Sequence, residues 1–526
     1  MKLVHPENRT QTSSNPQPLP ETRIFVIDFL MLCDPLLKLA RSEPDRLAII
    51  DDCARLTYGQ LATSASRVAA HLVRRSNSRP IALMLPGSSG FVNAFFGALL
   101  AGRTVAPLNL LLPPEHKAAA MDDCGAEVII TNEALRPAAD ALGRTVLTIE
   151  TLLGTAPNAS WNPADRKPMA PDDLAVLLYT SGTSGNPKGV CLTCGNLLTN
   201  VEDCIRYARM NRNHRFLGVL PLFHSFGMTT TMLAPLILGA EVMYRSGFHP
   251  TQMIADIHEH RISIVMAVAS MYAALLRVKS ASAKDFSSVY LTVSGGEALP
   301  RGVYDAFLKR FDVPILEGYG LTETSPVVSL NTPWAHAVGT VGKPLPRVEI
   351  RIVNEEGDEL PSDQTGEILL RGPSISPGYW NRLDETAAAF RNGWFHTGDL
   401  GCLEADGYLV IRGRKKEMLI VAGQNVFPRE IEEVLRGCPD VSEAAVLGRP
   451  DPHRGELPVA FVIPTPDTPL DKTALRRFCR GKLSNYKIPR HIFIHNTLPR
   501  SATGKILKRA LDPTTGNLIA PSQLGG

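Results

Sequence analysis

The feature that most limits how this chain can fold is an alternation of apolar, strand-like runs with helix-periodic stretches. The apolar runs cover residues 174–179, 216–220, 262–268 and 289–293. Strands that are joined through helices form βαβ units, so the pattern predicts parallel sheets with helices on both faces. We therefore expect an α/β protein with a large N-terminal body of βαβ-type sheets.

The pattern changes twice further along the chain. From about Val338 to Ile411, short strands alternate with Gly, Pro and Asp turns, which predicts a β-rich subdomain. Beyond the charged run Arg412–Glu417, a helix at Pro428–Leu435, a helix at about Lys472–Arg480 and three further strands predict a small, mobile α+β domain. The predicted order is a disordered leader (1–27), an N-terminal domain (28–412, with 338–412 β-rich), a hinge (413–417), a C-terminal lid domain (418–512) and a frayed tail (513–526).

Charge and cysteine content exclude several classes of protein. The 526 residues carry 55 Lys and Arg against 52 Asp and Glu, a net charge of +3, which is too weak to attract nucleic acid by bulk electrostatics. The nine cysteines are an odd number and spread out, which is typical of a reducing compartment. Without an apolar run of membrane-spanning length or a secretory signal, the chain is predicted to be cytoplasmic, with peripheral membrane contact left open.

The strongest chemical signal is the run Tyr179–Gly189, which directly follows a predicted buried strand. It supplies hydroxyls, tightly folding glycines with inward N–H groups, and one cation. These groups suit a cradle for a polyphosphate, although the order of residues is not that of a Walker A loop. The candidate phosphate-binding residues are Thr180, Ser181, Gly182, Thr183, Ser184, Gly185 and Lys188.

Six further motifs follow in a fixed order, and together with this run they make the chain resemble the adenylate-forming superfamily. That superfamily contains acyl-CoA synthetases, firefly-type luciferases and the adenylation domains of peptide synthetases. The resemblance extends from about Asp28 to Leu511. The six motifs are Pro221–Gly227, Ser294–Ala298, Gly318–Thr324, His396–Leu400, Gly413–Glu417 and Pro499–Lys505.

The resemblance implies a nucleotide site built from several of these motifs. Glycines near strand ends permit close backbone approach, and a carboxylate on a turn can accept hydrogen bonds from a ribose diol. Similarity to the family implies adenine contacts near residues 295–297, α-phosphate contact at Thr322, ribose contact at Asp399 and a nucleotide guanidinium at Arg414. The predicted nucleotide-binding set is completed by Gly295, Gly296, Glu297 and Tyr319.

The same resemblance implies residues for the chemistry. Glu323 is a hard oxygen ligand beside the phosphates and is the expected Mg²⁺ ligand. Lys505 matches the family's lysine for adenylation, Lys416 its hinge position, and Gly423 a position that leaves a pantetheine tunnel open. The implied reaction has two steps: attack of a carboxylate on Mg-ATP gives an acyl-adenylate, and a thiol then displaces AMP.

His224 informs the identity of the acid. Relatives that activate α-amino acids carry an Asp in this segment, and an imidazole cannot replace it as the partner of an ammonium group. Apolar neighbours could line an acyl pocket, although such clusters more often form core: Phe223, Phe226, Met228, Met266, Val268, Val293 and Val327. The wording of the motifs favours a medium- or long-chain fatty acid, hence a role in lipid metabolism.

Several alternatives stay open at this level. An aryl acid of the coumarate type is the other candidate substrate. The motifs do not distinguish coenzyme A from the phosphopantetheine of an acyl carrier protein as the acceptor. A non-catalytic nucleotide-binding module is disfavoured by Lys505 and Glu323.

Overall fold

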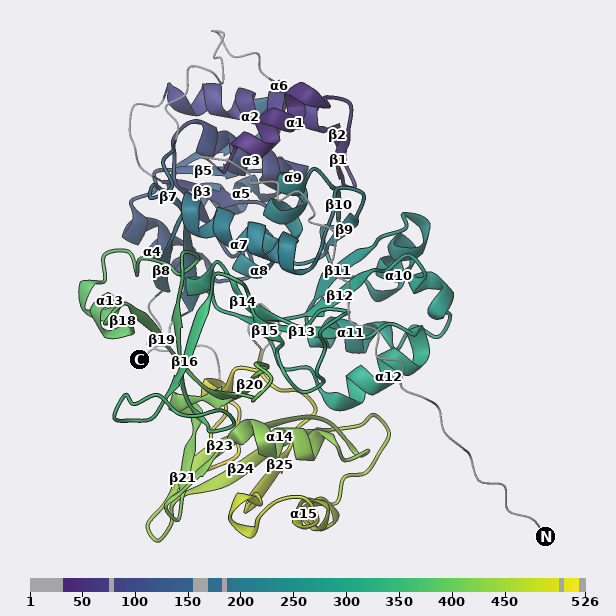
Figure 1. The fold of residues 1–526 in the computed structure, drawn as a ribbon, viewed down its shortest axis with the longest axis vertical. Coiled ribbons are helices and arrows are strands. Elements are labelled where there is room, and N and C mark those ends of the chain that lie inside the picture. The colour runs from purple at the N-terminus through teal and green to yellow at the C-terminus, as the bar shows by residue number, and fades with distance from the viewer. Residues whose placement is uncertain (1–31, 75–79, 155–168, 182–186, 501–505, 520–526) are drawn as a thin grey trace, which may run out of the picture.

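The computed structural model describes residues 32–74, 80–154, 169–181, 187–500 and 506–519 (Figure 1). It is a mixed α/β structure, as predicted. In Figure 1 the body occupies the upper part, the antiparallel β-rich part lies below it, and the small C-terminal domain forms the lower end. The predicted leader lies outside the described residues.

The first sheet of the body has six strands in the order β6-β5-β3-β4-β7-β8. All are parallel except β8, which forms an antiparallel hairpin with β7. The strands are β3 (Ile81–Met84), β4 (Val105–Pro107), β5 (Val128–Thr131), β6 (Thr145–Thr148), β7 (Leu174–Ser181) and β8 (Pro187–Thr193).

The second sheet of the body has nine strands in the order β15-β14-β13-β12-β11-β9-β10-β1-β2. The six strands from β13 to β1 in this order run parallel. The strands are β1 (Leu47–Ile50), β2 (Arg55–Thr57), β9 (Arg215–Gly218), β10 (Glu241–Tyr244), β11 (Ile264–Ala267), β12 (Leu291–Ser294), β13 (Leu316–Gly320), β14 (Val327–Leu330) and β15 (Lys343–Pro344).

Helices cover both faces of each parallel sheet. One continuous apolar core joins α2 and α3 to strands of both sheets, while α10, α11 and α12 cover the other face of the nine-stranded sheet and α4 the other face of the six-stranded one. The helices of the body are α1 (Asp34–Ser42), α2 (Tyr58–Val73), α3 (Ser89–Leu100), α4 (Pro114–Cys124), α5 (Arg136–Asp140), α6 (Ile149–Gly154), α7 (Cys194–Tyr207), α8 (Ser225–Gly227), α9 (Ala234–Leu238), α10 (Pro250–Glu259), α11 (Ala269–Leu275), α12 (Arg301–Phe311) and α13 (Leu383–Ala389).

The β-rich stretch forms an antiparallel sheet whose inner face joins the core of the body. Its strands are β16 (Glu349–Val353), β17 (Gly366–Arg371), β18 (Phe390–Arg391), β19 (Trp394–Leu403) and β20 (Leu409–Arg414). The small domain has an apolar core of its own. It contains β21 (Leu419–Val421), β22 (Gln424–Val426), α14 (Pro428–Arg436), β23 (Val441–Asp451), β24 (Gly455–Pro464), α15 (Lys472–Arg480) and β25 (His491–Ile494).

The prediction of a frayed tail is wrong for residues 513–519. This stretch turns back on the small domain, where the N–H of Ile519 donates to the carbonyl of Ala510 (2.8 Å) and Leu518 bridges Leu511. Gly516 adopts φ +79° and packs against the ring of Phe493, where a Cβ would lie only 2.1 Å from a ring carbon. Residues 513–519 thus form a turn that packs on the small domain.

Two ion pairs flank the predicted hinge position Lys416. Lys415 Nζ lies 2.9 Å from Glu367 on β17, in the body. Glu417 lies 2.7 Å from Lys508 Nζ in the small domain, and the same ammonium lies 2.9 Å from Glu432 on α14. Lys416 itself is exposed. The residues on its two sides are therefore fastened to different domains.

Within the described ranges, every helix is too short or too polar to cross a bilayer.

Replacing Lys508 with Met should destabilise the small domain by about 2–3 kcal/mol, because the carboxylates of Glu417 and Glu432 lose a largely desolvated cation. Hydrogen exchange of peptides from residues 419–494 during urea titration measures the loss. The matched control is Arg301→Met, which breaks an exposed pair with Asp305 and should cost no more than about 0.5 kcal/mol. Equal effects of the two changes would contradict the structural role of Lys508.

Candidate nucleotide-binding and active site

The parallel strands β12 and β13 end at the same edge of the nine-stranded sheet, and predicted site residues follow both. Gly295 comes directly after β12, and Thr322 and Glu323 begin the 3-10 helix η5 (Thr322–Thr324) after β13. A Cβ at Gly295 would lie 3.1 Å from the ring of Phe226. The backbone at Gly295 is therefore packed closely against the Phe226 ring.

Asp399 is the centre of a charged cluster that joins the body to the β-rich sheet. It is 3% exposed, accepts a hydrogen bond from the Tyr319 hydroxyl, and lies 2.7 Å from Arg414 Nε. The pairing of Asp399 with Arg414 follows from the register of β19 and β20. Burial and the neighbouring Asp399 carboxylate raise the pKa of Tyr319, so its phenol keeps its proton and donates.

The described ends of the predicted phosphate-binding run belong to the antiparallel strands β7 and β8. Thr180 and Lys188 lie opposite each other in the register of β7 and β8. Lys188 forms an ion pair with Glu385 on α13, and its ammonium lies 5.4 Å from the centroid of the Tyr379 ring. The predicted residues Gly182, Thr183, Ser184 and Gly185 lie outside the described residues, as does the side chain of Ser181.

Glu323 is held by the segment that follows the β17 strand. Its Oε1 accepts a hydrogen bond from the Tyr379 hydroxyl (2.9 Å), and its backbone carbonyl accepts one from the N–H of Ser376 (2.8 Å). Burial and the Glu323 carboxylate raise the pKa of Tyr379, so this phenol also stays protonated.

The donor set at Glu323 fits magnesium. Mg²⁺ in nucleotide sites is held through one or two carboxylates together with substrate phosphates and water. A single oriented carboxylate beside a phosphate-binding hairpin meets that requirement. Among the described residues there is no cluster of three or more Asp, Glu, His or Cys side chains that would hold a metal without the nucleotide.

The His224 segment meets the Thr322 segment across the sheet edge. His224 caps the start of α8, and the chain continues as a π-helix over Met228–Leu233, a geometry that is often found at functional sites. Ser225 Oγ lies 3.5 Å from Thr322 Oγ1. His224, the residue before Ser225, is half-buried.

The predicted acyl-pocket residues divide into two groups. Met228, Met266 and Val293 are buried in the main core, and Phe223 is also buried, so these four serve packing. Phe226, Val268 and Val327 are half-buried and pack against that core from the side of the site. Of the second group, Phe226 lies against Gly295, Val268 against Gly296 and Val327 against Gly320.

Three predicted residues lie elsewhere or have another use. The Glu297 carboxylate accepts the backbone N–H of Ser270 (2.7 Å) in the first turn of α11, which is a structural contact. Gly423 lies in the exposed turn between β21 and β22 with φ +76°, and a Cβ there would meet nothing within 4 Å. Lys505 lies outside the described residues.

Sequence reasoning missed the residues that hold these groups in place. Tyr379 and Asp123 are the two main examples: the Asp123 carboxylate accepts the Tyr179 hydroxyl (2.8 Å) and pairs with Arg382 (2.8 Å). The only local signal for Tyr379 is the Pro377–Asn381 turn, whose composition is that of an ordinary loop. Its importance depends on contacts with residues far away in the chain.

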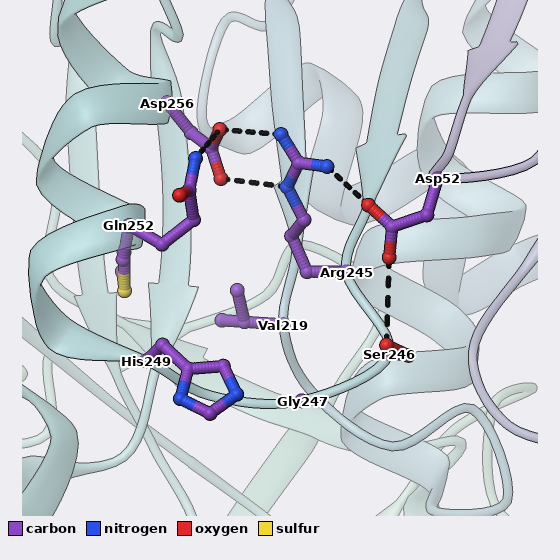
Figure 2. Close-up of a pocket in the computed structure, with 9 residues that line it drawn as sticks. Asp52, Val219, Arg245, Ser246, Gly247, His249, Gln252 and Asp256 are labelled. Carbon is purple, nitrogen blue, oxygen red and sulfur yellow. Dashed lines mark hydrogen bonds and ion pairs between the residues drawn. The ribbon is translucent and has the colours of Figure 1, made fainter.

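A separate hollow of about 250 Å³ lies at the ends of β9 and β10 (Figure 2). Arg245 forms its centre, with Nε 2.9 Å and Nη2 2.6 Å from the two oxygens of the buried Asp256, and with a further ion pair to Asp52. Gln252 donates to the same Asp256 carboxylate (3.0 Å). Two carboxylates already neutralise the guanidinium, so this arrangement ties α10 to the β1–β2 turn and offers little attraction to an anion.

The predicted nucleotide-binding residues that the structure describes lie near one edge of a parallel sheet, in a body followed by a small C-terminal domain. Residues 37–380 match the AMP-binding enzyme family, and residues 430–505 match the AMP-binding enzyme C-terminal domain. The chain belongs to the AMP-binding enzyme family. It is accordingly an acid–thiol ligase.

Relatives and solved structures of this family share most of the chain. A feruloyl-CoA synthase from an Amycolatopsis species is 33% identical over 90% of this chain and 96% of its own. A long-chain-fatty-acid–CoA ligase from Bacillus subtilis is 33% identical over 89% of this chain and 91% of its own. The o-succinylbenzoate CoA synthetase of Bacillus subtilis, solved with its acyl-adenylate intermediate, matches at TM-score 0.84 with 29% identity, over 92% of this chain and 99% of that one. The structure of the same enzyme with ATP and a magnesium ion matches at TM-score 0.82 with 28% identity, over 90% of this chain and 98% of that one.

Glu317 lies on β13 next to the site, near the charges of Arg429 and Glu433 in the small domain. Burial raises its pKa to about 7, against the partial attraction of Arg429 on α14, while Glu433 adds repulsion. Arg429 also crosses to the body, where its Nη1 donates to the carbonyl of Ile411 (3.1 Å).

Glu317→Gln should flatten the dependence of stability on pH between about 4.5 and 7. A carboxyl whose pKa is raised in the folded state stabilises that state fully below its unfolded pKa and loses this contribution as pH rises through 7. The wild type should therefore lose about 1–3 kcal/mol relative to the variant over that window. Unfolding midpoints at pH 5, 6, 7 and 8 measure the difference, with the exposed Glu355→Gln as control; parallel curves for wild type and Glu317→Gln would contradict it.

Proposed function

We propose that the chain activates a carboxylic acid with Mg-ATP and transfers the acyl group to coenzyme A. The observation that carries the proposal is the joining of the Asp399–Tyr319–Arg414 cluster with Thr322, Glu323 and Lys188 around one sheet edge. Asp399 accepts hydrogen bonds from the ribose hydroxyls in this proposal. Thr322 contacts the α-phosphate, and Lys188 with the Thr180 side of the hairpin binds the outer phosphates.

In the first step, a carboxylate oxygen of the acid attacks the α-phosphorus of ATP. The bond from that phosphorus to the bridging oxygen breaks, and pyrophosphate leaves with the electron pair. Magnesium, when bound at Glu323, neutralises charge on the phosphates. Arg414 and Lys505 stabilise the negative charge that builds on the α-phosphate oxygens, and His224 borders the acid.

In the second step, the thiol of coenzyme A loses its proton, its sulfur attacks the acyl carbonyl, and AMP departs. The small domain turns about Lys416 between the steps and brings the β21–β22 turn to the body. Gly423 at that turn leaves room for the pantetheine arm, consistent with the open space around its missing side chain.

For the acid we propose a medium- or long-chain fatty acid. The likeness to a long-chain-fatty-acid–CoA ligase and the apolar surface of Phe226, Val268 and Val327 support it. An aryl acid of the coumarate type is the second candidate, favoured by the likeness to a feruloyl-CoA synthase. The imidazole of His224, in place of a carboxylate, disfavours amino acids as substrates.

The first test is pyrophosphate release from Mg-ATP with a panel of fatty, aryl and amino acids, each with and without coenzyme A. Continuous turnover that requires coenzyme A and peaks at one fatty chain length is expected. A peak with ferulate or coumarate instead would replace the fatty acid with the aryl acid. Release that stops after about one turnover in either condition would retain adenylation and point to a carrier protein as acceptor.

Gly423→Leu should lower thioester formation from supplied acyl-adenylate by about tenfold or more, because its side chain would enter the proposed tunnel, and should leave single-turnover pyrophosphate release, measured without coenzyme A, within about twofold. Leucine at positive φ also strains the turn, so the control must share that strain. Gly407→Leu does so, since Gly407 has φ +86° and open space in a hairpin of the body. Equal loss of thioester formation in both variants would refute the tunnel role.

A further inference from the structure

We propose that Tyr379 is a positioning residue that orients the Glu323 carboxylate for magnesium and keeps the Lys188 ammonium apart from it. The proposal rests on the function proposed above and names a residue that none of the sequence motifs contains. It follows from the contacts of this residue with the strand β8, the helix α13, Glu323 and Lys188.

The backbone around Tyr379 is fixed to the phosphate-binding hairpin. The N–H of Trp380 donates to the carbonyl of Gly189 (2.8 Å), and the N–H of Cys191 donates to the carbonyl of Gly378 (3.0 Å). Tyr379 thus lies opposite Val190 as an added strand residue on β8. Its own N–H donates to Thr386 Oγ1 (3.0 Å), which ties it to α13.

The hydroxyl of Tyr379 fixes Glu323, whose side chain would otherwise sample several rotamers. It donates to Oε1 at 2.9 Å, while Ser376, three residues earlier in the same segment, donates to the carbonyl of Glu323. A carboxylate that gives one oxygen to a phenol keeps lone pairs on the other oxygen for a hard cation. The rotamer entropy of Glu323 is then lost on folding and not on binding of the metal.

The ring of Tyr379 contacts the ammonium of Lys188. Its centroid lies 5.4 Å from the ammonium, within the range of a cation–π contact. Lys188 also pairs with Glu385, so this cation has partners other than Glu323. An ammonium and a carboxylate that share a phosphate site would otherwise neutralise each other. One tyrosine therefore serves both the metal ligand and the phosphate ligand.

Tyr379→Phe separates the two contacts, because it removes the hydroxyl and retains the ring. Binding of Mn²⁺ in the presence of α,β-methylene-ATP, followed by electron paramagnetic resonance, should weaken by about tenfold, the size expected for a hydrogen bond to a charged group. In pyrophosphate exchange, the KM for Mg²⁺ should rise by the same factor, while kcat at saturating Mg²⁺ stays within about twofold. Tyr379→Leu should in addition raise the KM for ATP.

Tyr290→Phe is the matched control, since the Tyr290 hydroxyl donates to the carbonyl of Ala208 (3.2 Å) at a distant place in the body. It should leave Mn²⁺ binding unchanged. A double-mutant cycle with Glu323→Gln provides the decisive readout: the effect of Tyr379→Phe on Mn²⁺ binding should vanish when the carboxylate is absent. A purely structural role of Tyr379 would give the same loss in both backgrounds.

Unchanged Mn²⁺ binding in Tyr379→Phe overturns the proposal, as does a loss that persists in the Glu323→Gln background. The result is separable from that of the proposed function. If the wild type binds Mn²⁺ with the nucleotide analogue but turns over no acid, the proposed reaction fails, while weaker binding in Tyr379→Phe still supports the positioning role. If the wild type binds no Mn²⁺ with the analogue, both fail.

Discussion

The structure depends on the burial of parallel strands on both faces. Strands such as β3 and β11 are buried along their whole length, and this burial is achieved only when helices return the chain to the same end of the sheet before each new strand. Every parallel strand then ends at one edge. Gly295 after β12 and Thr322 after β13 come together for this reason, although 26 residues separate them in the sequence. The position of the site is a consequence of how the core forms.

Hydrogen bonds then fix the segment from Pro373 to Trp380, which lies beside the site. The segment from Pro373 to Trp380 crosses from the β-rich sheet to the hairpin of the six-stranded sheet, and its carbonyls at Pro373 and Ile375 accept hydrogen bonds from the Asn196 amide (2.9 and 3.0 Å). Ser376, which is 3% exposed, donates to the carbonyl of Cys191 (2.6 Å). Buried groups of this kind are costly when unpaired, so the network allows few alternative positions for the segment. Tyr379, which belongs to this segment, contacts Glu323 through its hydroxyl and Lys188 through its ring.

The small domain is attached differently. It has its own apolar core, and its described contacts with the body include polar ones, such as Arg429 with the carbonyl of Ile411 and the charges around Glu317. A polar contact surface exchanges protein partners for water at little cost. In the proposed mechanism the small domain turns between the two half-reactions, and the ion pairs of Lys415 and Glu417 tie the neighbours of Lys416 to the two domains.

The sequence by itself determined the class of fold, the helix at Lys472–Arg480, the family and the type of reaction, because apolar periodicity and motif spacing are local properties of the chain. Only the tertiary structure decided that the strands β7 and β8 on the two sides of residues 182–186 pair antiparallel, that residues 513–519 turn back, that Met228 and Met266 belong to the core, and that Tyr379 contacts Glu323. The physical reason is that each of these depends on groups that are distant in the sequence. Glu323 and Tyr379 are 56 positions apart, and no local pattern encodes a hydrogen bond over that separation. Burial and topology bring the two side chains together.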